Sequence, residues 1–316
     1  MDIVRADSSR TELGLLNKIK IDIDVGIDND FEIQASTNNN CLNVGDYFYI
    51  EGTEYGGVVR DITVDTRNKQ IKYNGSTFRG LLDERIIEPL SGDAYRTVSG
   101  TSASIITTLL AECDLDYIFR ADTTATVGIS SFQFDRYCSV LDGLNKMLKA
   151  VGHRLTISYQ DGFCYLGAVA IVDHSDSIEF SEDGNITFVI AKKTPPTHML
   201  CLGGGELEVR TVVNLYLQAD GSSIGLTEHY TGKDKITYLY DFVSSDDLEA
   251  DGRKKFAELL KPEEMEMNIE DIEVELYDIV GGREYITNTY LSREVTQKIV
   301  VIENGKTAIS YKVGEK

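Results

Sequence analysis

Apolar and polar residues alternate along two stretches near the start of the chain, residues 19–25 and 31–35. A two-residue period is typical of half-exposed β-strands, because successive side chains point to opposite faces. The Asp-Asn-Asp segment at 28–30 separates the two stretches and predicts a turn. The chain is therefore expected to begin with a pair of strands.

Aromatic and β-branched residues continue the pattern from Gly45 to Pro89. We expect strands at residues 47–51, 58–63 and 71–73, with turns at Gly45-Asp46, at the following glycines and at Asn68-Lys69. Short strands with turn signals every roughly 8–12 residues indicate a small antiparallel barrel or curled sheet. An apolar, arginine-bearing segment at 81–90 is expected to end this unit.

A second stretch near the end of the chain has a similar pattern. Residues 277–282 resemble 45–48, with Asp278 at the place of Asp46, and residues 309–314 resemble 71–75, with Tyr311 at the place of Tyr73. Between them we match Glu294-Val295-Thr296 to Asp61-Ile62-Thr63 and Asn304-Gly305 to Asn68-Lys69. The sequence thus predicts a repeated β-meander, although any two meanders share such features.

The period changes to that of a helix in the middle of the chain. Apolar residues at 105, 106, 109, 110 and 113 mark a helix capped by Thr101 or Ser102, and a second helix is expected from about Arg136 to Val151, followed by Gly152. A hairpin is predicted around residues 160–162, and 177–191 is strand-like with a turn at 183–185. This block indicates a small α+β domain inserted between the two meanders.

Strands broken by three glycines are predicted at 198–218, and a helix that begins at residues 244–247 and ends near Leu260, before Pro262. The predicted fold class is α+β and β-rich, with two similar small antiparallel β-barrels, an inserted α+β domain and a further helix-containing segment. The predicted domains are 1–92 (first β-barrel), 93–192 (inserted α+β domain), 193–265 (mixed strands plus helix) and 266–316 (second barrel-like meander, which can pack with 193–243).

Composition narrows the functional classes. The chain has 316 residues, 42% of them hydrophobic, which is enough for two or three cores. Its first residues are polar and its apolar runs are short, so we expect neither a signal peptide nor a membrane span. A net charge of −21 argues against binding nucleic acid through its phosphates. Five scattered cysteines without CxxC spacing predict reduced thiols.

Several motifs resemble catalytic or binding sites, but each fits a structural role better. The Gly221–Gly225 segment matches the GxSxG pattern of hydrolases, yet strand-like sequence follows it and predicts a hairpin turn. The glycines at 203–205 have no following GK[ST] and predict a bulge. The acidic run from Asp22 to Glu32 has isoleucine at the glycine and glutamate positions of a calcium loop, so solvated strand faces are expected.

The histidines do not form a recognisable metal or catalytic motif. The four of them, at 153, 174, 198 and 229, lack HExxH or HxH spacing. A glycosidase pair among 52 acidic residues depends on geometry rather than spacing, and the chain has no tryptophan to stack a sugar. We therefore predict no catalytic residue, no cofactor-binding residue, no metal ligand and no cofactor.

Three groups of residues together resemble a known family. They are Gly45-Asp46 with Gly56-Gly57-Val58-Val59, the segment Leu81–Ile87, and the ending that runs from Tyr277-Asp278-Ile279-Val280 to Gly314. In this layout the chain resembles bacteriophage tail hub proteins: the siphovirus baseplate hub, the N-terminal region of tail-associated lysins, and the related contractile-tail hub. The resemblance covers most of the chain through short patterns. In tail-associated lysins a lytic domain follows the hub region, whereas here the sequence ends after the second meander, so lytic activity is expected from another chain or a longer parent.

The resemblance implies a structural role without enzyme activity. It implies a homotrimer whose six barrels form a pseudo-sixfold ring at the virion tail tip, assembled in the bacterial cytoplasm. The implied partners are a distal tail protein ring or tail tube above, and a tail tip, fibre or lysin protein below. DNA would pass through the ring without specific binding, and no stable membrane insertion is expected. The alternatives are a carbohydrate-binding receptor-recognition protein, which predicts a pocket with stacked tyrosines, and a glycosidase or peptidase-type lysin.

Overall fold

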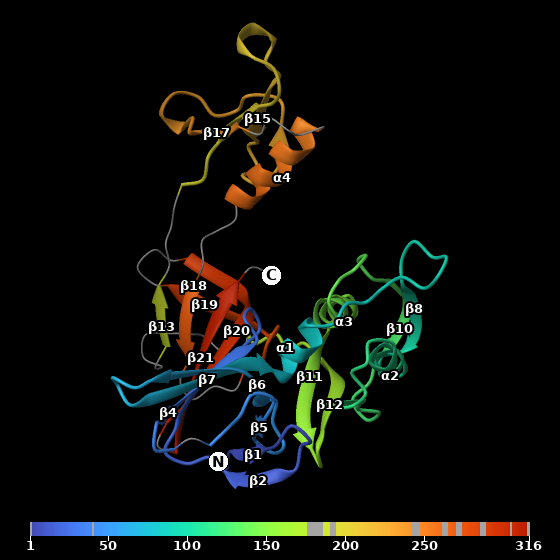
Figure 1. The fold of residues 1–316 in the computed structure, drawn as a ribbon. Helices are drawn as coiled ribbons and strands as arrows, with labels where there is room; N and C mark the ends of the chain where they lie inside the picture. Colours follow the sequence, from blue (N-terminus) through green and yellow to red (C-terminus); the bar gives the residue numbers. More distant parts are fainter. Residues whose placement is uncertain are drawn as a thin grey trace. The chain divides into compact units, whose positions relative to one another are not determined.

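The computed structural model describes residues 2–39, 41–175, 186–189, 194–241, 247–260, 265–269, 274–284, 289–303 and 305–314, with side chains omitted at 186–189, 265–269, 282–284 and 289–291. The chain forms two compact units. The first comprises Met1–Phe188 together with Glu266–Gly314, and the second is Val189–Met265. Figure 1 traces both units along the sequence.

The N-terminal part of the first unit is an antiparallel sheet module. Its strands lie in the order β3-β4-β7-β6-β5, and the short strands β1 and β2 continue the sheet beyond β5. The strands are β1 (Val4–Ala6), β2 (Glu12–Leu15), β3 (Lys20–Val25), β4 (Asp30–Ser36), β5 (Tyr47–Tyr49), β6 (Gly56–Asp65) and β7 (Gln70–Thr77). The predicted strands near the start of the chain are confirmed.

The C-terminal part of the first unit repeats this arrangement. Its strands lie in the order β13-β18-β21-β20, with β19 also paired to β20. They are β13 (Ile186–Val189), β18 (Met265–Ile269), β19 (Ile279–Glu284), β20 (Thr289–Glu303) and β21 (Lys306–Gly314). In each module the last hairpin therefore lies between an earlier strand on one side and a short strand on the other. We call these the first and second modules.

The two modules join through β3 and β20, so the predicted barrels occur as two halves of one 12-stranded sheet (Figure 1). The strands are antiparallel, with Ile23 opposite Val300. Gly26 sits where the β3–β4 turn meets β20: it has φ +121°, and a Cβ there would lie 2.2 Å from the carbonyl oxygen of Thr296. Gln297 Nε2 also donates a 2.9 Å hydrogen bond to Asp24 Oδ1. The predicted β-rich α+β fold class is confirmed.

The sheet has one apolar face and one polar face. The buried positions of β3, β4 and β7 alternate with partly exposed ones, as a two-residue period requires. The buried side chains include Ile21, Ile23, Ile33, Ile71 and Tyr73. The partly exposed positions between them include Asp22, Asp24, Glu32, Gln34 and Lys72.

An α+β segment lies between the modules along the chain, and its core is continuous with buried residues of β1, β5 and β6 of the first module. Its elements are α1 (Phe78–Asp83), β8 (Thr97–Thr101), α2 (Ser102–Glu112), β9 (Phe119–Ala121), β10 (Gly128–Gln133), α3 (Val140–Lys149), β11 (His153–Gln160) and β12 (Phe163–Ala170). The hairpin around residues 160–162 is confirmed, with positive φ at Asp161 and Gly162. The turn predicted at 183–185 lies outside the described residues.

Caps fix the ends of the helices in this segment. The side chain of Thr101 accepts from Ser104 N and caps α2, one of the two predicted starts. Helix α3 begins later than predicted because Tyr137 has φ +59° and Ser139 caps the helix instead. Gly152 follows α3 with φ +70°, as expected for a residue beyond a helix end. The sequence did not predict β8 or the short helix α1.

The second unit is a four-stranded sheet in the order β16-β15-β14-β17 with a helix against it. Its elements are β14 (His198–Leu202), η1 (Leu207–Val209), β15 (Val212–Leu217), β16 (Ile224–Gly225), η2 (Gly232–Asp234), β17 (Thr237–Asp241) and α4 (Leu248–Leu260). Asp247 Oδ1 accepts from Ala250 N at the start of α4, which confirms the predicted helix. None of the described helices is long and apolar enough to cross a membrane.

Candidate assembly surface

A buried aspartate organises the same tight turn in both modules. Asp46 Oδ2 accepts a 2.7 Å hydrogen bond from Asn43 N, and Asp278 Oδ2 accepts a 3.1 Å bond from Glu275 N. The two aspartates are only 5% and 2% exposed. A buried carboxylate needs such donors, because desolvation without hydrogen bonds is costly. These equivalent hydrogen bonds confirm the predicted match of Asp278 to Asp46.

The backbone bonds that follow are also the same in both modules. Val59 N donates to the carbonyl oxygen of Asp46 and Val295 N to that of Asp278, both at 2.9 Å. The return bonds, from Gly45 N to Val59 O and from Tyr277 N to Val295 O, are both 2.8 Å. Gly45 and Tyr277 both have positive φ, +90° and +71°. A register shift follows each valine, one residue further along the strand.

These bonds correct one predicted match. Val295 corresponds to Val59, so the segment 294–296 matches 58–60 and not 61–63. Residue types alone misled the comparison, because the sequences Asp-Ile-Thr and Glu-Val-Thr look alike. The bulge and the paired backbone bonds decide the alignment, and the extra residues of the second module lengthen its β19–β20 pairing relative to the β5–β6 pairing of the first.

The last hairpin of each module extends the correspondence. Tyr73 of β7 lies opposite Ile62, and Tyr311 of β21 lies opposite Lys298. Both tyrosines are buried, as expected from their predicted match. One step along the same face, Val64 lies opposite Ile71 and Val300 opposite Ile309. Val64 therefore corresponds to Val300, and Ile62 to Lys298.

The corresponding positions differ sharply in exposure. Val300 is 0% exposed, whereas Val64 is 54% exposed. The cause is the neighbouring strand: β3 pairs with residues 298–303 of β20, whereas β5 pairs only with residues 56–58 of β6. Among the described residues, no strand pairs with the outer edge of residues 60–65. We call residues 60–65 of β6 the open edge. It lies on the β6–β7 hairpin (Figure 1).

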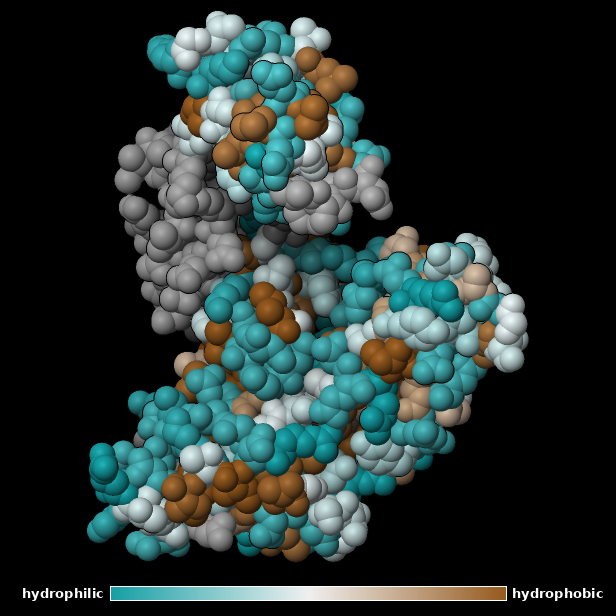
Figure 2. Space-filling view, turned by 45° about the horizontal axis from the view of Figure 1, so that its top comes forward, coloured by the Kyte–Doolittle hydropathy of each residue, from teal (hydrophilic) through white to brown (hydrophobic). Residues whose placement is uncertain are grey.

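The polar face of the first module is acidic. Asp22 and Asp24 on β3 neighbour Asp30 and Glu32 on β4. Partial burial raises the pKa of Asp24, and the negative charges of Asp22, Asp30 and Asp28 add to the shift. Burial and the charges of Asp28 and Asp22 raise the pKa of Asp30 in the same way. On the visible face of the molecule, hydrophilic residues surround small hydrophobic clusters (Figure 2).

One lysine offsets part of this charge. Lys72 Nζ on β7 lies 2.9 Å from Glu32 Oε2. Burial by itself would raise the pKa of Glu32, but the hydrogen bonds from Lys72 and Gln34 outweigh it and lower the pKa. Asp22, Asp24 and Asp30 have no such cation among the described ion pairs, and no group of carboxylates in the described part of the chain is arranged to hold a metal. Asp22 and Asp24 are partly exposed and Asp30 is exposed, which matches the expectation of solvated strand faces.

Buried ion pairs attach the α+β segment to both modules. On the first module, Arg79 Nε lies 2.6 Å from Glu54 Oε2, and Arg79 also donates to the carbonyl oxygen of Leu155. On the second module, Arg154 Nε lies 3.2 Å from Asp278 Oδ1. Asp278 Oδ1 also accepts from Val172 N, so the organising aspartate of this module serves as an anchor as well.

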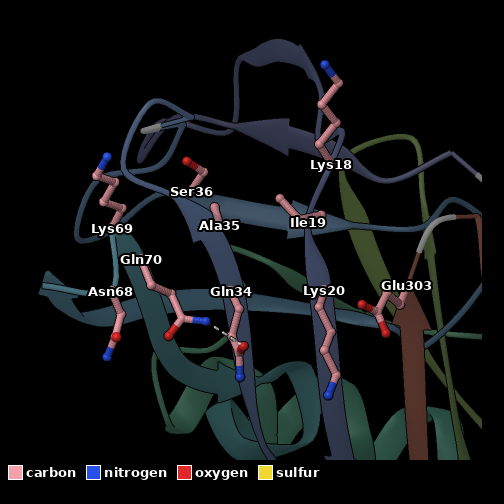
Figure 3. A pocket seen from close by; sticks show the side chains of 10 residues that line it. All are labelled: Lys18, Ile19, Lys20, Gln34, Ala35, Ser36, Asn68, Lys69, Gln70 and Glu303. Atoms are coloured by element: carbon pink, nitrogen blue, oxygen red, sulfur yellow. Dashed lines mark hydrogen bonds between the residues drawn. The ribbon is translucent and has the colours of Figure 1, made fainter. Parts of the chain in front are cut away.

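A polar hollow of 430 Å³ lies at one end of the first unit (Figure 3). Gln70 Nε2 donates to Gln34 Oε1 across it, while the side chains of Lys18 and Lys69 point away. The other lining residues are Ile19, Lys20, Ala35, Ser36, Asn68 and Glu303. This hollow lacks the stacked tyrosines expected of a carbohydrate receptor.

The remaining sequence candidates have structural surroundings. In the GxSxG segment, Ser223 Oγ donates to Asp220 Oδ2 within a turn, and these hydrogen bonds lower the pKa of Asp220 to about 2. Gly203 packs beside Leu248 and Thr211, and Gly205 has φ +98°. His198 contacts Thr237 and Asn214 inside the second unit.

Burial is the main cause of a raised thiol pKa at all five cysteines. The two in strands β12 and β14, Cys164 and Cys201, are fully buried. Each of the five is a free thiol, as the scattered spacing predicted.

Solved structures with a similar fold include tail proteins. The tail protein from Neisseria meningitidis MC58 aligns over 100% of this chain and 96% of its own length, with a TM-score of 0.51 and 11% identity. The prophage tail protein gp18 from Listeria monocytogenes EGD-e aligns over 100% of this chain and 95% of its own, with a TM-score of 0.53 and 11% identity. The chain has the fold of phage tail proteins.

A further structure supports the same conclusion. The 43 kDa tail protein of prophage MuSo2 from Shewanella oneidensis aligns over 100% of this chain and 98% of its own length, with a TM-score of 0.52 and 11% identity. No protein-family model matches the sequence, and no curated protein matches it significantly. The resemblance to phage tail proteins is thus confirmed for the fold. At 11% identity, the comparison supports the shared fold alone.

Proposed function

We propose that this chain is a structural subunit of a phage or prophage tail hub, in which three copies form a pseudo-sixfold ring. The shared fold with tail proteins supports a place in the tail. The duplicated module is the observation that carries the ring proposal. Each chain contains two modules with the same strand order and the same turn around Asp46 and Asp278. Three chains then supply six similar modules, which suits a joint between a sixfold tube and a threefold tip.

The acidic face suits the lining of a channel through the ring. If the polar face of the sheet lines the bore, Asp22, Asp24 and Asp30 repel the phosphates of passing DNA. Such a bore binds no DNA, in keeping with the net charge of −21. The electrostatic potential of an assembled ring tests this point, and a basic or neutral bore would contradict it.

The subunit works through its surfaces rather than by catalysis. Its neighbours in the tail are a distal tail protein ring or tail tube above and a tip, fibre or lysin protein below. Its place is the tail tip of the virion, and it assembles in the bacterial cytoplasm without membrane insertion. The structural roles of the GxSxG turn and of His198 are consistent with a protein that has no enzyme activity.

The mass and shape of the assembled protein test the proposal. The full chain is purified, alone and with neighbouring tail proteins, and examined by mass photometry and negative-stain microscopy at micromolar concentration. We expect a particle three times the mass of the 35.2 kDa chain, with threefold class averages and a central channel. Parent particles in which the labelled subunit lies away from the tail end would refute the proposal.

A further inference from the structure

The open edge of β6 combines two features that are unfavourable in an isolated chain. Its backbone edge lacks a partner strand within the described residues, and its core-side residues Ile62 and Val64 are 36% and 54% exposed. Exposed strand edges that carry apolar residues invite pairing with another chain, and natural proteins usually cover them or place charges there. The edge also carries the charged residues Arg60, Asp61 and Asp65, but its two apolar core-side residues are left uncovered, so this edge has the properties of an unfilled strand-pairing site.

The second module contains the filled version of this site. There the corresponding segment of β20 pairs with β3, with Lys298 opposite Val25 and Val300 opposite Ile23. The pairing buries Val300 completely. The alternating apolar residues of β3 thus provide the strand that the corresponding edge of β6 lacks.

The strand that corresponds to β3 in the second module is β13. The strand orders β3-β4-β7-β6 and β13-β18-β21-β20 match position by position, so β13 takes the place of β3. β3 pairs on its other side with β20, whereas β13 ends the described sheet. Its sequence, Ile186-Thr187-Phe188-Val189, is rich in strand-forming apolar residues. Within one chain, β20 and β3 pair with each other. The corresponding strands β6 and β13 each have an edge that is unpaired among the described residues.

We infer that the open edge of β6 pairs with β13 of a second copy of this chain. This inference rests on the proposed ring and assigns its subunit contact. The contact repeats between chains the β20–β3 pairing that joins the modules within one chain. It buries Ile62 and Val64 and continues the sheet from each copy to the next. Because β6 and β13 are different strands, the contact is heterologous, as the proposed ring requires and a twofold dimer does not.

The test uses an exposed valine at the edge and a matched control. Val64→Asp places a charge in the proposed contact, and Val212→Asp changes a valine of similar exposure, 49%, in the second unit. Both residues are well exposed in the single chain, so both variants should melt within about 2 °C of the unaltered protein. We expect Val64→Asp to reduce ring formation at least about tenfold, because it leaves a charge in a desolvated strand contact. Val212→Asp should assemble normally.

Amide exchange on the unaltered protein gives an independent measurement. Peptides covering residues 60–65 and 186–189 should exchange at least about tenfold more slowly in the ring than in the single chain. Normal assembly of Val64→Asp, or unchanged exchange in either peptide when rings form, would overturn the inferred pairing of β6 with β13. Neither result would contradict the proposed ring. Failure of the unaltered protein to form rings would overturn both proposals.

Discussion

The two organising aspartates allow a matched comparison of how the α+β segment is anchored. Asp278→Ala removes the acceptor for Val172 N and for Glu275 N, and it leaves Arg154, whose side chain is 14% exposed, without its ion-pair partner. Breaking a buried ion pair by removing one partner costs about 3–5 kcal/mol. Asp46→Ala removes hydrogen bonds from Asn43, for which about 1–3 kcal/mol is expected.

The free energy of unfolding, measured by urea denaturation, should therefore fall by about 2 kcal/mol more for Asp278→Ala than for Asp46→Ala. Amide exchange at residues 172–175 should rise only in the first variant, because those residues depend on the carboxylate of Asp278. A cycle with Arg154→Met then isolates the ion pair, with an expected coupling of about 1–3 kcal/mol. Equal losses for the two aspartates together with no coupling to Arg154 would refute the anchoring role.

Three further predictions follow from burial and charge. Val300→Ala should lower the free energy of unfolding by about 2 kcal/mol, because it removes two buried methyl groups and leaves a cavity. The exposed counterpart Val64→Ala should change the free energy of unfolding by less than about 0.5 kcal/mol in the single chain. The pKa of Asp30 is raised in the folded state, so its charge opposes folding at neutral pH and this penalty fades as the pH falls through the folded pKa towards the ordinary value of 3.8. Asp30→Asn should therefore stabilise the protein at pH 7, by less than about 1 kcal/mol after solvent screening, and urea midpoints should show the gain shrinking as the pH is lowered. The five cysteines have raised thiol pKa values, so at pH 8 they should react with a thiol reagent at least about tenfold more slowly in the folded than in the urea-unfolded protein.

Local patterns predicted much of the fold but not its long-range pairing. The alternation at 19–25, the Asp161-Gly162 turn and the cap at Thr101 are set by neighbouring residues, and the structure confirms each of them. The contact between β3 and β20 joins residues more than 270 positions apart, and no local period encodes such a register. Helix α1 escaped prediction because it has six residues and buries Arg79, which breaks the apolar pattern.

The candidate assembly surface was only partly visible in the sequence. The match of Asp278 to Asp46 and of Tyr311 to Tyr73 predicted the repeat, since these residues hold corresponding turns and core positions. The open edge was not predicted, because Ile62 and Val64 have the alternation of any half-buried strand. Its exposure becomes apparent only when Val64 is compared with Val300, which has the corresponding position in the second module but is covered by the neighbouring strand β3.

The link between β13 and β18 also bears on how such proteins diversify. In the first module the equivalent link between β3 and β4 is a short turn at residues 26–29, whereas in the second module the whole of the second unit occupies this position. A segment that leaves and re-enters the sheet at neighbouring strands can be lengthened, exchanged or trimmed without disturbing the strand order. Selection can therefore vary the inserted unit independently while the duplicated framework stays constant.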